Sequence, residues 1–184
     1  LEPLIRTERR VGLPNFDPCT VLINNDLRAG APGILEELYE QYILPPVHAG
    51  WHVRRRSRHL ACYEEVAKRF GKMLGIDPWL VAPLFSPCGE LDLAQAPDQA
   101  TLREQVDALL GRIRRKYKEY GIPEKAFVIL KAEQGVAGGG EGVAIHSPDD
   151  LDAQLPRLRE HFGAQGRSGP VGLVLQEGVP SYER

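Results

Sequence analysis

The sequence of 184 residues lacks the features that mark several classes of protein. Its three cysteines, Cys19, Cys62 and Cys88, form no C-x-x-C pair, which argues against a disulfide scaffold and a cysteine zinc site. A formal net charge of -2 offers no overall attraction to nucleic acid or to an anionic membrane. No apolar run approaches the roughly 20 residues of a membrane-spanning helix. We therefore expect a cytoplasmic globular protein, with neither nucleic acid nor membrane among its partners.

Familiar catalytic and phosphate-binding motifs are also missing. The chain has no G-x-x-x-x-G-K-[ST], no G-x-G-x-x-G that opens a helix, no H-E-x-x-H and no G-x-S-x-G. His48 and His52 are four residues apart, but the nearby prolines and Gly50 disfavour the helix that would align them. We read them as polar loop residues, with a zinc site as the weaker alternative.

Hydrophobic periodicity predicts four helices. The sequence is 42% hydrophobic and 26% charged, as is usual for a protein with a packed core. We expect a short helix over 33–42, a long helix over 57–74 that Gly75 closes, a second long helix, and a last one capped by Ser147. The predicted apolar faces of the two long helices consist of Leu60, Tyr63, Val66, Ala67, Phe70 and Leu74, and of Leu102, Val106, Leu109, Leu110, Ile113 and Tyr117.

Short β-rich runs predict strands between these helices. They lie at 20–24, 127–130, 142–145 and 171–176, whereas residues 76–98 indicate turns and short extended pieces. The alternation of strands and helices indicates an α/β or α+β fold, with antiparallel pairing across the segment 131–142.

That segment is unusually rich in glycine. Five of the twelve residues from Lys131 to Gly142 are glycine, and β-rich runs flank them, as in a hairpin with an oversized tip. Such a tip allows backbone amides to surround phosphate oxygens while the lysine adds a positive charge. A surface loop without a ligand is the alternative that the glycine content leaves open.

Two further clusters are candidate sites. The run from Arg54 to Arg58 places positive charge at the predicted start of a helix, which opposes the helix dipole. Either a bound anion compensates for it, or acidic side chains do; the candidates are Glu36, Glu37, Glu64 and Glu65. Asn25 and Asp26 follow a strand, where α/β folds often contact ligands.

The order of these features resembles the ATP-grasp ligases. A strand ends in a lysine, a glycine-rich hairpin and a helix follow, and a last strand ends in a glutamate-containing hinge. Seven words, in this order, are similar to proteobacterial glutamate-cysteine ligases of the ATP-grasp type: LINNDL, LPPVHAGWHVRRRSRH, EVAKRFGKMLGIDPWL, CGELD, KYKEYGI, FVILKAEQG and LQEGV. The resemblance covers essentially the whole chain.

The resemblance implies an ATP-grasp-like α/β fold. A substrate-side, pre-ATP-grasp-like part over 1–56 would precede the first ATP-grasp lobe over 57–184. The implied activity joins glutamate to cysteine: ATP phosphorylates the side-chain carboxylate of glutamate, and the amine of cysteine attacks the acyl phosphate. The products are γ-glutamylcysteine, ADP and phosphate, in the first step of glutathione synthesis.

The same resemblance assigns roles to individual residues. Lys131 would contact the ATP phosphates, Gly135, Gly138, Gly139 and Gly140 would let the loop close over them, and Gln176, Glu177 and Val179 would form the adenine and ribose hinge. We expect Arg55 and Arg58 to take part in catalysis. The expected contacts to glutamate and cysteine are Asn25, Asp26, His52, Arg54 and Arg56.

Two departures from the family pattern qualify these expectations. The loop reads QGVAGGG where the family has approximately Ala-Gly-Thr-Tyr-Gly-Met-Gly, so closing it would cost more entropy. The chain also stops just past the hinge, so the ligands for Mg²⁺ are expected outside it. We therefore expect a partial ligase that needs the missing parts, with a catalytically silent nucleotide- or anion-binding module as the alternative. The sequence is compatible with a homo-oligomer and does not define the oligomeric state.

Overall fold

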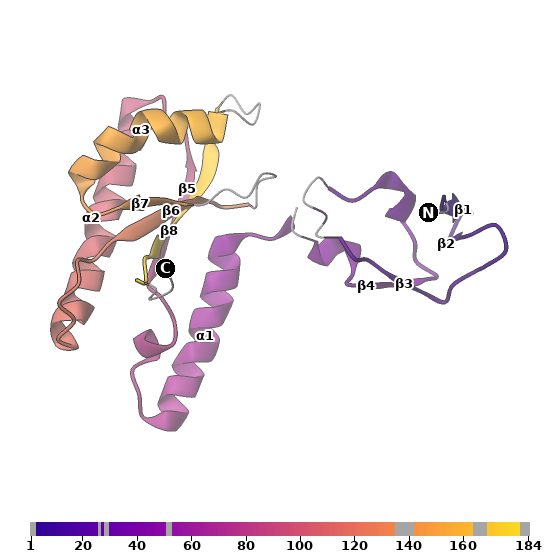
Figure 1. The fold of residues 1–184 in the computed structure, drawn as a ribbon, viewed down its shortest axis with the longest axis horizontal. Helices are drawn as coiled ribbons and strands as arrows, with labels where there is room; N and C mark the ends of the chain where they lie inside the picture. Colours follow the sequence, from indigo (N-terminus) through magenta and orange to yellow (C-terminus); the bar gives the residue numbers. More distant parts are fainter. Residues whose placement is uncertain are drawn as a thin grey trace. The chain divides into compact units, whose positions relative to one another are not determined.

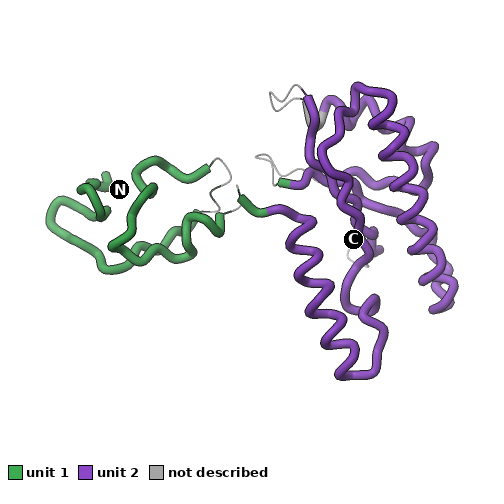
Figure 2. The backbone as a smooth tube through the Cα atoms, turned by 180° about the vertical axis from the view of Figure 1, so that it is seen from behind, with its two compact units in different colours: residues 1–54, 134–137 green, residues 55–133, 138–184 purple. Residues whose placement is uncertain are grey.

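A computed structural model of the chain describes residues 3–25, 27, 30–50, 53–134, 142–163 and 169–180, with side chains in the last helix up to residue 160. The chain divides into two compact units (Figure 2), which we describe separately. Unit 1 comprises residues 1–54 with 134–137, and unit 2 comprises residues 55–133 with 138–184. The domain division at residue 56 stays a prediction, because compact units of one chain need not be separate domains.

Unit 1 contains short elements around a small core. An antiparallel pair joins β1 (Ile5–Arg6) to β2 (Val11–Gly12), and a parallel pair joins β3 (Thr20–Leu22) to β4 (Tyr42–Leu44). The described part of the unit also contains the 3-10 turns η1 (Gly33–Leu35) and η2 (Val47–Ala49). Its buried core consists of Val11, Leu35 and Leu38, with Ile23, Ile34, Ile43 and Val47 packed against them.

The short helix expected over 33–42 is wrong. Only the single turn η1 forms there, and Glu37 has a φ of 54°, which is incompatible with a continuing right-handed helix. Residues 42–44 instead pair with β3 as a strand. The chain forms turns and a bend before Tyr42, and the buried side chain of Gln41 holds this arrangement because it bonds both the N–H and the C=O of Val11 at 2.9 Å.

Unit 2 is a four-stranded antiparallel sheet with three helices (Figure 1). Its elements are α1 (Arg56–Leu74), η4 (Pro78–Leu80), β5 (Phe85–Leu91), α2 (Ala96–Glu119), β6 (Val128–Ala132), β7 (Val143–Ile145), α3 (Pro148–Gly163) and β8 (Val171–Glu177). The strand order is β5-β8-β6-β7. The two long helices, the last helix with its Ser147 cap, the hairpin of β6 and β7, and the last strand are confirmed.

One strand of this sheet departs from expectation. β5 runs through the segment read as turns and short extended pieces. Its sequence contains Pro87 and Gly89, which disfavour strands, and the ladder to β8 shifts between these two residues. The irregularity explains why the local pattern conceals a seven-residue strand.

The sheet has one face covered by helices and a second face that is more polar. α2 and α3 lie together on one side of the sheet, and α1 lies apart from them (Figure 1). The first face, toward α2 and α3, carries fully buried side chains, among them Val128, Leu130, Leu173 and Leu175. Alternation along the strands places Lys131 and Gln176 on the second face.

The apolar stripe of α1 is largely exposed, unlike that of α2. Val66 is 63% exposed and Leu74 57%, whereas Ala67 is buried, as is the nearby Gly71. Gly71 must be small, because a Cβ atom there would lie 2.7 Å from the carbonyl oxygen of Ile76. The helix ends at Gly75 in the left-handed conformation with a φ of 68°, as its sequence predicts.

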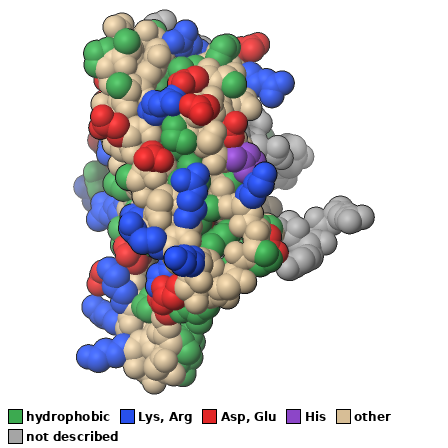
Figure 3. Space-filling model, turned by 90° about the vertical axis from the view of Figure 1, so that its left-hand side faces the viewer, with side chains coloured by type: hydrophobic (Ala, Val, Ile, Leu, Met, Phe, Trp, Pro, Cys, Tyr) green, Lys and Arg blue, Asp and Glu red, His purple; other side chains and the backbone are tan. Residues whose placement is uncertain are grey.

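The side of unit 2 that carries α2 and α3 shows basic and acidic side chains interspersed (Figure 3). Part of this pattern is a local network in which Arg103 of α2 pairs with Asp149 and Asp152 of α3. No helix in the described part of the chain is both long and apolar enough to span a bilayer.

Candidate functional site

Lys131 and Gln176 lie beside each other on the second face of the sheet. β6 and β8 pair antiparallel with Ile129 opposite Gln176 and Lys131 opposite Val174, so the two polar side chains are diagonal neighbours. The Nζ atom of Lys131 donates a hydrogen bond of 2.9 Å to Oε1 of Gln176. The root of the glycine-rich hairpin and the end of the last strand thus meet at one place.

The ammonium group of Lys131 is in an unfavourable electrostatic environment. Burial lowers its pKa below the usual range, and the positive charge of Arg56 lowers that pKa further. Within the described part of the chain Lys131 forms no ion pair, and the amide of Gln176 that accepts its hydrogen bond is neutral. An anion bound next to Lys131 would therefore relieve both the burial of the charge and the repulsion.

The first turn of α1 is attached to the chain directly after β6. The N–H of Arg56 donates to the carbonyl oxygen of Glu133 at 2.9 Å, and its guanidinium donates to the carbonyl oxygen of Ala132. The carboxylate of Glu133 accepts hydrogen bonds from the N–H of Ser57 at 3.1 Å and from its hydroxyl. These bonds fix Arg56 at the end of β6, close to Lys131.

Glu133 also answers the question of how the charge at the start of α1 is compensated. Its carboxylate lies at the helix N-terminus, where negative charge is favoured. Two of the glutamates considered from the sequence act elsewhere, because Glu64 and Glu65 pair with Lys68 on the same helix. The protein therefore supplies part of the compensating charge itself, from the end of β6.

The predicted hinge, residues 176–179, begins in the last two residues of β8. The N–H of Gly178 donates to the carbonyl oxygen of Phe127 at 2.9 Å, and a Cβ atom on Gly178 would lie 2.0 Å from the Phe127 ring. A larger residue at this position would therefore force the Phe127 ring to move. Among the described residues the N–H of Val179 has no hydrogen-bond partner, so it is available to a ligand.

The side chain of Glu177 points away from Lys131. It is only 3% exposed, and its oxygens accept hydrogen bonds from Nε1 of Trp79 at 2.9 and 3.1 Å and from the N–H of Leu84 at 2.8 Å. Because Glu177 follows Gln176 on β8, its carboxylate lies on the first face of the sheet. Contacts of Glu177 on the second face would come from its backbone.

Trp79 is held in place by Asp77, a residue that no sequence motif indicated. Asp77 accepts hydrogen bonds from the N–H of Trp79 at 2.9 Å, from the hydroxyl of Tyr120 at 3.0 Å and from the ammonium of Lys116. The bond from Lys116, followed by that from Trp79, lowers the pKa of Asp77. The Trp79 and Tyr120 rings lie 5.0 Å apart. These contacts join η4 to α2 and, through Trp79 and Glu177, to the hinge.

The other predicted residues lie in different places. Arg55 and Arg58 are exposed in unit 2 at the start of α1. Arg54 belongs to unit 1, where its Nε donates to the carbonyl oxygen of Ala49 at 2.8 Å, as does Asn25, whose side chain accepts from the N–H of Leu27 at 2.7 Å. The predictions for Asp26, His52, Gly135, Gly138, Gly139 and Gly140 fall outside the described residues.

No cluster of three or more His, Cys, Asp or Glu side chains suited to a metal occurs among the described residues. Burial raises the pKa of the Cys88 thiol to about 12, which favours its protonated form at neutral pH.

The comparisons with known proteins bear on this arrangement. A family model described as "GshA: Glutamate-cysteine ligase" matches residues 1–184. The chain belongs to the glutamate-cysteine ligase family. Its sequence is 42% identical to that of a solved protein from Methylobacillus flagellatus KT that is provisionally described as a gamma-glutamylcysteine synthetase, and the structures superpose with a TM-score of 0.87. The alignment covers 98% of this chain and 42% of that chain. A search of curated proteins gives no match.

Proposed function

We propose that the second face of the sheet in unit 2 binds ATP for a carboxylate-amine ligase reaction, with glutamate and cysteine as the substrates. The observation that carries this proposal is the bond between Lys131 and Gln176, which joins the root of the glycine hairpin to the strand that ends in the hinge. Membership of the glutamate-cysteine ligase family supports the same reaction class.

The geometry suggests what each group contributes to nucleotide binding. Lys131 offers a partly buried positive charge that no described carboxylate neutralises, which suits the phosphate chain. The free N–H of Val179 and the neighbouring backbone suit the edge of a purine. Arg56, fixed to the end of β6, adds a second positive charge next to Lys131. We keep Gly135, Gly138, Gly139 and Gly140 as the proposed cover of the phosphates.

The chemical step is the formation of an acyl phosphate on the side chain of glutamate, followed by attack of the amine of cysteine. Charge neutralisation around the transferred phosphoryl group is the main requirement of such a step. Lys131 would serve it, and we keep Arg55 and Arg58 as proposed catalytic groups at the start of α1. Asn25, Asp26, His52 and Arg54 remain our candidates for contacts to the amino-acid substrates, together with Arg56.

Magnesium does not fit the described residues, since they contain no suitable cluster of ligands. We therefore assign no step to Mg²⁺ within this part of the chain. The chain spans 42% of the length of the similar solved protein. The complete ligase reaction is therefore proposed for a longer protein that includes this chain.

Two experiments test the proposal. Release of ADP that requires both glutamate and cysteine, measured with Mg-ATP on the full-length protein, would support the ligase reaction. A full-length protein without such turnover would contradict it. Calorimetry of the 184-residue chain with ATP tests binding alone. Measurable binding without turnover in any form of the protein would favour the second candidate, a silent nucleotide-binding module.

A further inference from the structure

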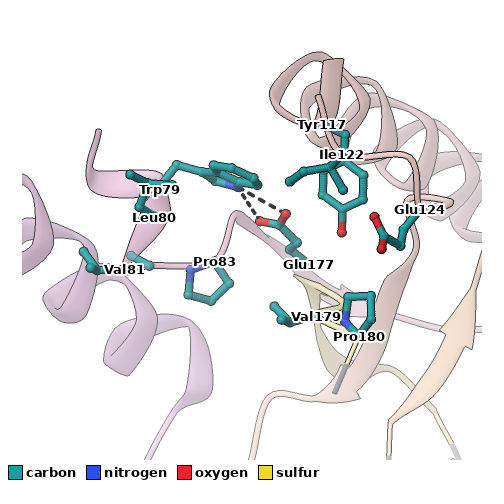
Figure 4. Close-up of a pocket in the computed structure, with 11 residues that line it drawn as sticks. Trp79, Leu80, Val81, Pro83, Tyr117, Ile122, Glu124, Glu177, Val179 and Pro180 are labelled. Atoms are coloured by element: carbon teal, nitrogen blue, oxygen red, sulfur yellow. Dashed lines mark hydrogen bonds between the residues drawn. The ribbon is translucent and has the colours of Figure 1, made fainter. Parts of the chain in front are cut away.

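A cavity of 470 Å³ lies behind the hinge, on the first face of the sheet (Figure 4). Its volume is within the range of small-molecule sites. The indole of Trp79 and the ring of Tyr117, which are tilted against each other with centroids 6.1 Å apart, form one part of its wall, and Leu80 and Val179 add apolar surface. Lys131 and Gln176 project from the second face, so the cavity lies across the sheet from the proposed phosphate contacts and shares only the hinge residues Glu177 and Val179 with the proposed ATP site.

The charged groups among the described residues of the cavity wall are all carboxylates. Glu177 and Glu124 contribute carboxylates, and no lysine, arginine or histidine is among the described residues that line the cavity. The buried carboxylate of Glu177 is held only by uncharged donors, the indole of Trp79 and the N–H of Leu84. A carboxylate accepts about four hydrogen bonds, so Glu177 can take a further donor.

Tyr117 adds a hydroxyl group at the same place. The close-up shows its hydroxyl directed toward the space between Glu177 and Glu124 (Figure 4). Burial raises the pKa of Tyr117, and the charges of Glu177 and Glu124 raise it further, so the hydroxyl stays protonated at neutral pH. The cavity thus combines aromatic walls, apolar surface and two carboxylates, which is the composition that favours a cation on an apolar body.

We propose that this cavity binds a small organic cation, a primary ammonium carried by an aromatic or aliphatic group. The ammonium donates to the carboxylates of Glu177 and Glu124, and its apolar part packs against Trp79, Leu80 and Val179. Burial of an anion without a cationic partner is costly, and such a ligand supplies the missing charge. The proposal does not depend on the ligase reaction.

Calorimetry with two probes of equal size tests the choice of ligand. We expect 2-phenylethylammonium to bind at least about ten-fold more tightly than 2-phenylethanol, because a hydrogen bond to a charged group is the stronger one. Equal affinities would overturn the cationic part of the proposal, and no binding of either probe at millimolar concentration would overturn it altogether.

Fluorescence locates the probe. The chain contains two tryptophans, so Trp51→Phe leaves Trp79 as the sole reporter. We expect the ammonium probe to change the emission of Trp79 with the affinity found by calorimetry. Binding without any change in emission places the probe elsewhere and contradicts the proposal.

Matched substitutions identify the cavity as the site. Leu80→Lys places a cation in the cavity wall and should therefore abolish binding of the amine. Leu74→Lys on α1 is the control and should leave binding unchanged, because Leu74 does not line the cavity and is similarly exposed, at 57% against 52% for Leu80. Glu124→Gln should weaken the amine about two- to five-fold without affecting the alcohol, and Glu104→Gln on α2 should have no effect. Unchanged affinity in both Leu80→Lys and Glu124→Gln would reject this cavity. ATP affinity, measured in parallel, reports separately on the proposed function.

Discussion

Replacing Lys131 with methionine is the most direct test of the proposed ATP site. The substitution keeps an unbranched apolar side chain and removes the ammonium that donates to Gln176 at 2.9 Å. A charge-assisted hydrogen bond to a phosphate contributes about 1.5 to 3 kcal/mol, so the dissociation constant for ATP should rise about ten- to 150-fold. Calorimetry of the chain with ATP at constant ionic strength measures this change.

The structure predicts that the same substitution does not lower the folding stability of the protein without ATP. Burial and the charge of Arg56 both disfavour the charged form of Lys131, whose pKa is lowered in the folded state. The unfolded chain therefore binds more protons between the folded pKa and the ordinary value of 10.5, and the penalty on stability is complete below that window. Lys131→Met should remove this penalty, so its urea midpoint should equal or exceed that of the unmodified chain.

The combination of weaker ATP binding and undiminished stability separates a binding role from a structural one. Lys125→Met is the matched control, because Lys125 is exposed in the loop before β6, and it should change neither quantity. An ATP affinity within two-fold of the original in Lys131→Met would remove Lys131 from the site. A large loss of stability would instead make it a structural residue.

Three further substitutions test the surroundings of the site. Gly178→Ala forces the Phe127 ring to move and should lower the free energy of unfolding by about 1 to 3 kcal/mol in urea titrations, whereas Gly111→Ala, with open space around it in α2, should not. Asp77→Asn should make the stability of the protein depend less on pH in the acid range. Because the pKa of Asp77 is lowered in the folded state, its carboxylate stabilises the fold fully above the ordinary pKa of 3.8, and this stabilisation is lost as the pH falls through the folded pKa. Thermal melts from about pH 2 to about pH 6 measure this dependence. Ser57→Ala removes the hydroxyl bonded to the carboxylate after β6 and should cost about 0.5 to 1.5 kcal/mol of stability by the same urea assay; an unchanged midpoint would argue that water replaces the bond.

The elements with strong periodicity were predictable from the sequence, and those shaped by distant contacts were not. The apolar stripe of α2, from Leu102 to Tyr117, is buried as expected, because six residues repeat at helical spacing. The segment 33–42 has a comparable local pattern, yet it forms turns, and Gln41 within it bonds to Val11 thirty residues away. No local signal contains that contact.

In the candidate site, too, some residues were predictable from the sequence and others depend on distant contacts. Lys131 and the end of β8 were identified by their order along the chain, and the register of two antiparallel strands brings them together. Trp79 and Glu133 were missed. The indole of Trp79 meets Glu177 across 98 positions, and Glu133 meets Ser57 across 76, so only the folded chain makes these pairs visible.

The strand order has a mechanical consequence for this part of the chain. β8 is hydrogen-bonded on both edges, to β5 and to β6, whereas β7 has one neighbour among the described strands and only three residues. Shifting β8 would require two ladders to break, but β7 can separate by breaking one. The strand that carries Gln176 is therefore the stiff support of the sheet, and its amides should exchange with deuterium more slowly than those of β7. Any movement that admits a nucleotide should begin at the β7 edge.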